Sequence, residues 1–432
     1  MKRVGLVCLA VLLGASVWIF AGPSIAWAGA DPIVLGCPTS LYTPYGSETA
    51  KAAELAVEEI NAAGGVKVGN VKRPFKMIVS DTRGGEPGTP VHDSLMAYEK
   101  LITENKPHAI VVGAFRSEVL IAAMDLVAKY KVPHLSCPAQ TPMFQKKFSE
   151  NPKKYKYLFR VGPDALISGT YINRALDTLK KKFGLDRVLF IYQDVLWTRA
   201  FSGIMRRNCK KNVWTEIGYD GYAGSANDFS PALTKAKDQN AQVIVMVWDA
   251  PLGSGIFCKQ HKAMKVPAMV VGFVPTLASA YAVKTLGPVV EDSVTVEFPI
   301  GSSLPLKKVP KTVEFQKKLR KMLGGPPDAA AVISSGYDAV YILRDAIERA
   351  NSLDPDKIVA ALEKTDYQGV SGRLRFNKQH CAIFGYEDPT KTGLCTNFQW
   401  QKDSKGKLKR VPVYPPYVAE GKLQLPQNMK KK

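Results

Sequence analysis

The 432-residue sequence lacks the short motifs that mark many enzymes. It has no Gly-x-Ser-x-Gly elbow, no His-Glu-x-x-His, no Cys-x-x-Cys and no phosphate-binding Gly-x-x-x-x-Gly-Lys pattern. Its five histidines do not show the spacing of metal ligands. These absences argue against several hydrolase classes, zinc sites, dithiol redox chemistry and nucleotide-dependent catalysis. We therefore expect a protein that is not an enzyme and that holds no metal and no cofactor.

Long apolar runs are also missing, except at the N-terminus. Lys2 and Arg3 precede an almost wholly apolar stretch at residues 4–21, and residues 26–30 offer small side chains for cleavage. This pattern predicts a signal peptide at residues 1–30 and export to the periplasm. The alternative is an uncleaved membrane anchor, because the run approaches the roughly 18–20 residues needed to span a bilayer.

Cysteine is scarce, and Cys8 lies within the predicted signal peptide. An oxidising compartment permits disulfides among the remaining six. We predict a disulfide between Cys381 and Cys395, which flank a loop rich in Gly, Asp, Pro and Thr. A Cys37–Cys137 pair is the alternative, because both follow apolar strands. Cys209 and Cys258 fall on helical patterns and are predicted to be buried thiols.

Acidic residues are too few to balance the basic ones. Lys and Arg total 59 against 38 Asp and Glu, which gives a formal net charge of +21. The basic residues are scattered over predicted helix faces and concentrate at residues 405–410 and 430–432, so nucleic acid is not the expected partner. A solvated basic surface, attraction of an anionic solute and attraction to a membrane surface remain open.

Apolar runs alternate with helical patterns along most of the chain. Residues 33–37 read as a strand, 38–45 as a polar loop, 46–62 as a helix ended by Gly64 and Gly65, and 75–81 as the next strand. A second such series starts near Asp164, so we expect an α/β protein with two doubly wound, Rossmann-like lobes. Ligands of such sheets bind at the carboxyl ends of strands, so Tyr42 and Tyr45 are expected to face a pocket.

Several motifs resemble those of type I periplasmic binding proteins of the branched-chain amino acid ABC transporter family, the leucine/isoleucine/valine-binding-protein-like group. They are Gly46 with the helix ending at residues 59–65, then residues 78–81, then 111–113 followed by Ser117, and residues 398–400 with Tyr414-Pro415. The resemblance covers nearly all of the chain after the predicted signal peptide.

The resemblance implies two lobes joined by three hinge crossings. Lobe I would hold residues 31–159 and 293–352, and lobe II residues 160–292 and 353–432. The implied protein is a monomer that captures a small solute between its lobes and delivers it to an ABC permease in the inner membrane. The alternative function is a ligand-sensing receptor subunit for a membrane signalling protein.

The resemblance also suggests binding residues. Ser117 matches a hydroxyl at a helix start that holds a ligand carboxylate, although it could instead serve only as the N-cap of its helix. The loop of Ala139, Gln140 and Thr141 matches a segment that offers a hydroxyl and a carbonyl, with Gln140 where threonine is expected. Tyr45 matches an aromatic residue of the first loop, and Trp197 matches an aromatic residue of lobe II that covers the ligand. The alternative for both is ordinary packing in the core or at the rim.

One expected anchor is missing, which widens the expected ligand class. The family's amino acid binders carry an acid after the strand that corresponds to residues 268–272, but this chain continues Phe273-Val-Pro-Thr276. Asp249 or Asp194 could replace that acid, and Arg116 adds a cation. Trp197, Trp248 and Phe273 would suit a flat apolar body. The ligand is therefore expected to be an amino acid held by different anchors, or an organic carboxylate, including an aromatic one.

Overall fold

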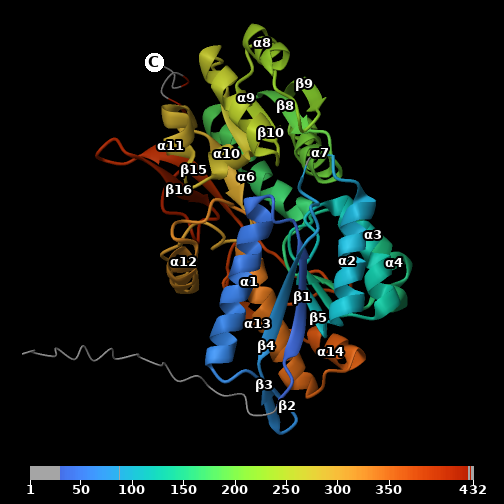
Figure 1. The fold of residues 1–432 in the computed structure, drawn as a ribbon. Coiled ribbons are helices and arrows are strands. Elements are labelled where there is room, and N and C mark those ends of the chain that lie inside the picture. Colours follow the sequence, from blue (N-terminus) through green and yellow to red (C-terminus); the bar gives the residue numbers. More distant parts are fainter. Residues whose placement is uncertain (1–29, 87, 427–428, 430–432) are drawn as a thin grey trace, which may run out of the picture.

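The chain forms two lobes, each built around a β-sheet, as the computed structural model shows (Figure 1). The structure describes residues 30–86, 88–426 and 429. Residues 1–29 of the predicted signal peptide and Lys430 to Lys432 lie outside this range. Within it, no helix combines the length and the apolar character needed to cross a membrane.

The sheet of lobe I has five parallel strands. Their spatial order is β4 (Phe75–Asp81), β1 (Ile33–Thr39), β5 (Ala109–Val112), β6 (His134–Ser136) and β7 (Leu158–Arg160). A two-stranded hairpin of β2 (Val66–Val68) and β3 (Val71–Arg73) extends from its lower end in Figure 1.

The sheet of lobe II has seven strands. The two that come last in the chain lie at one edge of the sheet and pair antiparallel with their neighbours. The order is β16 (Leu408–Tyr414), β15 (Thr396–Lys402), β12 (Val294–Glu297), β11 (Met269–Phe273), β10 (Val243–Val247), β8 (Arg187–Gln193) and β9 (Thr215–Tyr222). A second hairpin pairs β13 (Tyr367–Gly369) with β14 (Gly372–Leu374).

Helices cover both sheets. Those of lobe I are α1 (Pro44–Ala62), α2 (Val91–Asn105), α3 (Ser117–Tyr130), α4 (Met143–Glu150), α5 (Pro152–Tyr155), α13 (Ile333–Ala350) and α14 (Pro355–Leu362). Those of lobe II are α6 (Ala165–Phe183), α7 (Leu196–Lys211), α8 (Ser230–Asp238), α9 (Pro251–Ala263), α10 (Pro275–Ala278), α11 (Ala282–Leu286) and the 3-10 helix η1 (Gly287–Val290). Helix α12 (Pro310–Leu323) packs beside α1.

The inner strands are buried on both faces because helices cover both sides of each sheet. Every residue of β5 and of β10 is buried, as expected for apolar runs in parallel sheets. The predicted α/β class with two doubly wound lobes is confirmed.

The division of the chain between the lobes differs from the expected one at two places. Strand β12, expected in lobe I, pairs with β11 and β15 in the sheet of lobe II. Helix α14, expected in lobe II, packs on α13 of lobe I. The cause is that an isolated strand or helix carries no local signal for the sheet that it joins. The second crossing thus follows Glu297, and the third follows the contact of Cys381 with β7.

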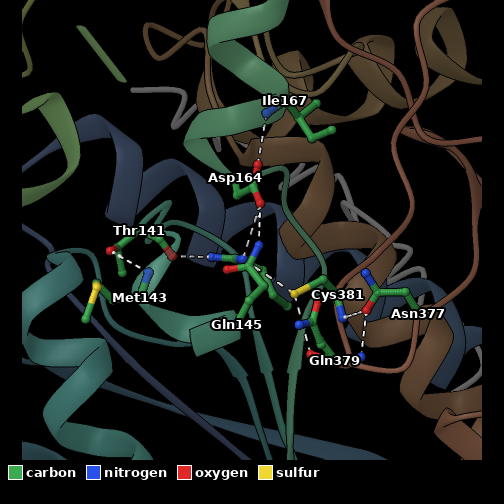
Figure 2. Close-up of polar contacts among 9 residues, drawn as sticks. Thr141, Met143, Gln145, Asp164, Ile167, Asn377, Gln379 and Cys381 are labelled. Carbon is green, nitrogen blue, oxygen red and sulfur yellow. Dashed lines mark hydrogen bonds and ion pairs between the residues drawn. The ribbon is translucent and has the colours of Figure 1, made fainter. Parts of the chain in front are cut away.

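The first crossing, between β7 and α6, is built around the buried side chain of Arg160. Its guanidinium donates to the Thr141 carbonyl at 2.8 Å and to Sγ of Cys381 at 3.4 Å, and it lies 3.6 Å from the Asp164 carboxylate. Asp164 also accepts from the Ile167 amide and so caps α6. Figure 2 shows Thr141, Asp164 and Cys381 converging from three chain segments. One buried cation therefore ties both neighbouring segments to the crossing.

The predicted disulfide between Cys381 and Cys395 is wrong for this structure, in which both residues are free, buried thiols. Cys381 pairs with Arg160 at the edge of the lobe I sheet. Cys395 directly precedes β15 in lobe II, where its amide hydrogen-bonds to the hydroxyl of Tyr171. Between the two cysteines the chain passes from lobe I to lobe II. Its middle folds back on itself, with the Gly385 amide donating to the Gly393 carbonyl at 2.9 Å and the Gly393 amide to the Ile383 carbonyl at 3.0 Å. Cys37, Cys137, Cys209 and Cys258 are also free and buried.

Replacing Arg160 with methionine is expected to lower the free energy of unfolding by about 3 kcal/mol, because the Asp164 carboxylate would stay buried without its cation. Urea unfolding followed by circular dichroism would measure this loss. Arg207→Met is the control, since Arg207 lies on the surface of α7. Equal and small losses for the two variants would contradict the role assigned to Arg160.

Candidate functional site

The lobes meet at the carboxyl ends of their strands through four aromatic rings, which we call the interlobe aromatic cluster. Tyr45 in the first turn of α1 stacks on Phe115, with ring centroids 6.0 Å apart. The Tyr45 ring also lies 5.9 Å from that of Phe273 at the end of β11. Phe273 lies 5.8 Å from the ring of Trp197 in α7. Three of the four residues were predicted from the sequence, and Phe115 was not.

The start of α3 follows Phe115 directly. Arg116 occupies the N-cap position, and Ser117 is the first helical residue. Ser117 is 1% exposed, and its hydroxyl has no hydrogen-bond partner among the residues that the structure describes. Ser117 does not cap the helix, because Arg116 occupies the N-cap position and the Ser117 hydroxyl bonds to no backbone amide among the described residues. A buried hydroxyl beside free helix-start amides suits an anionic oxygen.

A tight turn between β5 and α3 sets the position of Ser117. Val112 and Gly113 have φ values of 67° and 79°. A Cβ on Gly113 would lie 2.2 Å from Nε2 of His134, so both space and conformation demand glycine. Burial lowers the pKa of His134 to about 3, so the turn rests against a neutral imidazole.

Arg116 and Glu118 flank Ser117, and Glu118 links the two lobes. The Arg116 guanidinium donates to the Thr89 carbonyl at 2.9 Å, and its Nε lies 3.7 Å from the Glu118 carboxylate. Glu118 accepts a hydrogen bond of 3.3 Å from the amide of Leu196 at the start of α7. Arg116 is therefore held by lobe I and is neither fully exposed nor free.

Asp249 lies at the end of β10 and faces the aromatic cluster from lobe II. Its Oδ2 accepts from Nε1 of Trp197 at 2.7 Å, and its amide donates to Oε1 of Gln193 at 3.1 Å. Burial raises the pKa of Asp249, and the Glu118 charge adds to this effect. Asp194, the alternative anchor, is exposed and pairs with Arg199. The structure thus places Asp249, and not Asp194, beside Trp197.

Two further carboxylates, Glu48 and Asp328, lie near the Tyr45 hydroxyl. Glu48 in α1 accepts from the amides of Asp328 and Ala329 at 2.9 Å. Asp328 itself accepts from the hydroxyl of Ser279. Burial raises the pKa of Tyr45, and the charges of Asp328, Asp249 and Glu48 raise it further. The three carboxylates therefore share one neighbourhood around Tyr45.

The site therefore has more negative than positive charge. Glu48, Glu118, Asp249 and Asp328 surround the aromatic cluster, and Arg116 forms an ion pair with Glu118 alone. No ion pair joins the other three carboxylates to a basic side chain within the described part of the chain. Half-buried carboxylates without a cationic partner favour a ligand that supplies a positive group.

The predicted loop of Ala139, Gln140 and Thr141 is buried at the first crossing. The Gln140 carbonyl accepts from the Ala165 amide at 2.9 Å, and Oε1 of Gln140 has no partner among the described residues. Thr141 offers its carbonyl to Arg160 and its hydroxyl oxygen to the Met143 amide. The loop thus connects the hinge to the interlobe region.

Two predicted residues do not join the cluster. Tyr42 is 60% exposed. Trp248 lies in the core of lobe II, with its ring 5.2 Å from that of Phe229 and against the backbone of Gly253. Trp248 and Asp249 are neighbours on an extended strand end, where successive side chains point to opposite sides, so only Asp249 faces lobe I.

Sequence reasoning missed Phe115, Glu48, Glu118 and Asp328. Phe115 and Glu118 are direct neighbours of Arg116 and Ser117, and Glu48 lies one turn after Tyr45 in α1. These positions could have been found from their predicted neighbours. Asp328 lies 280 residues from Glu48, and no local pattern marks it.

Comparison with known proteins gives a consistent result. A family model described as "Periplasmic binding protein" matches residues 34–384. The chain is 24% identical over 400 residues to a Leu/Ile/Val-binding protein homolog 1 of Brucella suis biovar 1, a match that covers 92% of this chain and 96% of the relative.

Two solved structures illustrate the similarity of fold. One is a branched-chain amino acid transporter substrate binding protein from Streptococcus pneumoniae in complex with isoleucine, with a TM-score of 0.69, 21% identity, and coverage of 89% of this chain and 100% of that chain. The other is a solute binding protein of an ABC transporter from Rhodopseudomonas palustris BisB5 in complex with 3,4-dihydroxy benzoic acid. Its TM-score is 0.70, its sequence identity is 17%, and the match covers 90% of this chain and 98% of that chain.

The Glu48 carboxyl predicts a pH dependence of stability. Burial raises its pKa from 4.5 to about 7, against the opposing effect of two backbone hydrogen bonds. Between these pH values the folded state keeps a proton that the unfolded state releases, so stability should fall as pH rises through this window. Glu48→Gln should reduce the loss between pH 5 and pH 8 by on the order of 2 kcal/mol.

Urea unfolding at the two pH values would measure this difference. The control is Glu58→Gln, an exposed position in the same helix. Burial also raises the pKa of Glu297 to about 7 and that of Asp338 to about 6, and both groups contribute in the same direction. The dependence of stability on pH should therefore weaken in Glu48→Gln but not disappear. A wild-type slope in Glu48→Gln would contradict the assigned pKa.

Proposed function

The chain belongs to the periplasmic binding protein family, and from this premise we propose that it is the substrate-binding protein of an ABC importer whose solute is an amino acid. The protein binds the solute between its lobes and presents it, chemically unchanged, to a membrane permease. The observation that carries this proposal is Asp249, a carboxylate beside the interlobe aromatic cluster that forms no ion pair with a basic side chain among the described residues.

The carboxylate of the amino acid is assigned to the start of α3. The Ser117 hydroxyl is buried and lacks a partner there, and the first amides of the helix have no intrahelical acceptors. The positive end of the helix dipole favours an anion at this position. Arg116 adds a positive charge beside it. These groups recognise a carboxylate whatever the rest of the solute is.

The ammonium group is assigned to Asp249. Burial raises its pKa even though the charge of Arg116 lowers it in part, and a ligand ammonium would stabilise the ionised carboxylate further. Trp197 orients Asp249 through its indole N–H, and Tyr45, Phe115 and Phe273 provide apolar and π-rich walls. The site therefore supports a zwitterion with an apolar or aromatic side chain.

An aromatic carboxylate is the second candidate solute. Four clustered rings suit a flat apolar body, and a similar fold holds 3,4-dihydroxy benzoic acid in the Rhodopseudomonas palustris protein. Such an acid has no ammonium group and would leave Asp249 without a partner. The excess of carboxylates around the rings therefore favours the amino acid.

Capture between lobes requires that the lobes move at the crossings. The Arg160 cluster holds one crossing together, and the Glu118–Leu196 and Tyr45–Phe273 contacts hold the lobes near each other. A solute that touches both Ser117 of lobe I and Asp249 of lobe II adds contacts that exist only when the lobes are close. Binding thus shifts the population toward the closed form.

A thermal-shift screen tests the function. The purified protein is heated with single amino acids and, in parallel, with benzoate, hydroxybenzoates and dicarboxylates. An amino acid at 100 times its dissociation constant should raise the stability of the folded state by about 2.7 kcal/mol, seen as a higher Tm. Stabilisation by benzoates alone would select the second candidate, and no shift with any compound would contradict both.

Two variants separate the ends of the site. Ser117→Ala should weaken binding of any carboxylate about tenfold or more, because a hydrogen bond to a charged group is lost. Asp249→Asn should weaken amino acids similarly but leave benzoates unchanged or tighter, since it removes a negative charge. Calorimetry measures both, with Asp194→Asn as the exposed control. Equal affinities of Asp249→Asn and Asp194→Asn for amino acids would remove Asp249 from the site.

A further inference from the structure

The ends of four helices come together at the pole of lobe II that faces away from lobe I. Lys180 near the end of α6 donates to the Val213 carbonyl just past α7, and Lys237 near the end of α8 donates to the Met264 carbonyl after α9. Arg187 donates to the Gln239 carbonyl and so links the α6 end to the α8 end. The C-terminal ends of α6, α7, α8 and α9 therefore form one continuous surface.

This surface carries an excess of lysine, which we call the lysine pole. Its exposed lysines form no ion pair with any carboxylate among the described residues. Asp186 and Asp238 are the exposed acids on the same segments, so the charge stays clearly positive. The lysine pole consists of Lys181 and Lys182 from α6, Lys210 and Lys211 from α7, and Lys262 and Lys265 from the end of α9.

Helix stabilisation alone does not account for the lysine pole. Cations at helix C-termini are favourable, and this could explain a lysine in each last turn. The pattern is not general at the other lobe, since α1, α2 and α14 have no basic residue in the last turn, whereas α4, α5 and α12 have one or two. The basic residues that end α3 and α13 are neutralised, Lys129 by Glu99 and Arg349 by Asp345.

A groove of about 860 Å³ lies at the same pole. Lys182 and Lys422 lie on its lining, together with the apolar side chains of Phe183, Leu185 and Leu423. The groove thus combines cationic and apolar groups on a surface rich in unpaired lysines. A phospholipid surface offers the complementary combination of phosphates for the cationic groups and acyl chains for the apolar ones.

We propose that the lysine pole docks the protein on an anionic phospholipid bilayer. Each lysine near such a surface is attracted by its negative potential, and the attraction adds over clustered lysines and falls with salt. The attraction between the positively charged chain and the bilayer would thereby be concentrated at the lysine pole. An acidic partner protein would need a surface whose shape matches the lysine pole. A bilayer has no fixed shape of this kind, so it can bind a broad basic surface that has a single groove.

The location of the lysine pole leaves the solute site free. Gln193 and Asp249 lie at the carboxyl ends of β8 and β10, and the helix ends of the pole lie at the opposite edge of the same sheet. Bilayer contact therefore covers neither Asp249 nor the interlobe aromatic cluster. Docking keeps the protein at the membrane surface while its lobes remain able to open.

Vesicle co-sedimentation tests the proposal with protein purified from the periplasmic fraction. Vesicles of phosphatidylcholine with phosphatidylglycerol are compared with vesicles of phosphatidylcholine alone. The protein should sediment with the former only, and raising the salt from about 0.05 M to about 0.5 M should release it. Failure to bind phosphatidylglycerol vesicles at low salt would overturn the proposal.

A pair of variants with equal net charge separates the lysine pole from general charge. The pole variant replaces Lys181, Lys182, Lys210 and Lys211 with glutamate, and its affinity for the anionic vesicles should fall at least about tenfold. The control variant replaces four exposed lysines of lobe I with glutamate, at positions 76, 100, 146 and 153. Its affinity for the anionic vesicles should fall much less than that of the pole variant. Equal losses would overturn the proposal. An unchanged Tm in both variants shows that they fold.

Discussion

The central constraint on this protein is that the parallel strands of its two sheets turn their carboxyl ends toward each other. Loops and helix starts that follow these strands must then share one narrow region, and the contact of Tyr45 with Phe273 marks where they meet. Ser117, Trp197 and Asp249 reach that region because each follows a strand of its own sheet. The same arrangement sends the far ends of the helices to the outer poles, where solvent or a surface can reach them.

Charge is distributed unevenly along this axis. The interlobe region collects carboxylates next to aromatic rings, and burial raises the pKa of Glu48 and Asp249 there. The outer pole of lobe II collects lysines that lack acidic partners in the described part of the chain. A formal charge of +21 therefore says little about the site, whose local charge has the opposite sign. The local arrangement of charged residues, and not the net charge of the chain, therefore decides what the interlobe region and the outer pole of lobe II each attract.

The crossings between the lobes use buried polar groups where apolar packing would be expected. Arg160 binds the Thr141 carbonyl, the Asp164 carboxylate and the Cys381 thiol within one fully buried cluster. At the second crossing, Ser303 donates to Glu297 and accepts from Arg410. Directional bonds of this kind hold the crossing segments in a defined geometry, whereas apolar contacts alone would allow them to slide.

Local pattern determined much of the fold, because the alternation of apolar strands with amphipathic helices requires only near neighbours. It placed the strands and helices of both lobes, and the glycine turn before Ser117 marked one end of the site. Tertiary structure alone decided that β12 and α14 change lobes, that Trp248 is core, and that Cys381 and Cys395 stay apart. It also brought Asp328 to Glu48. Such pairings join residues far apart in the chain, and their energies depend on packing that no short stretch of sequence contains.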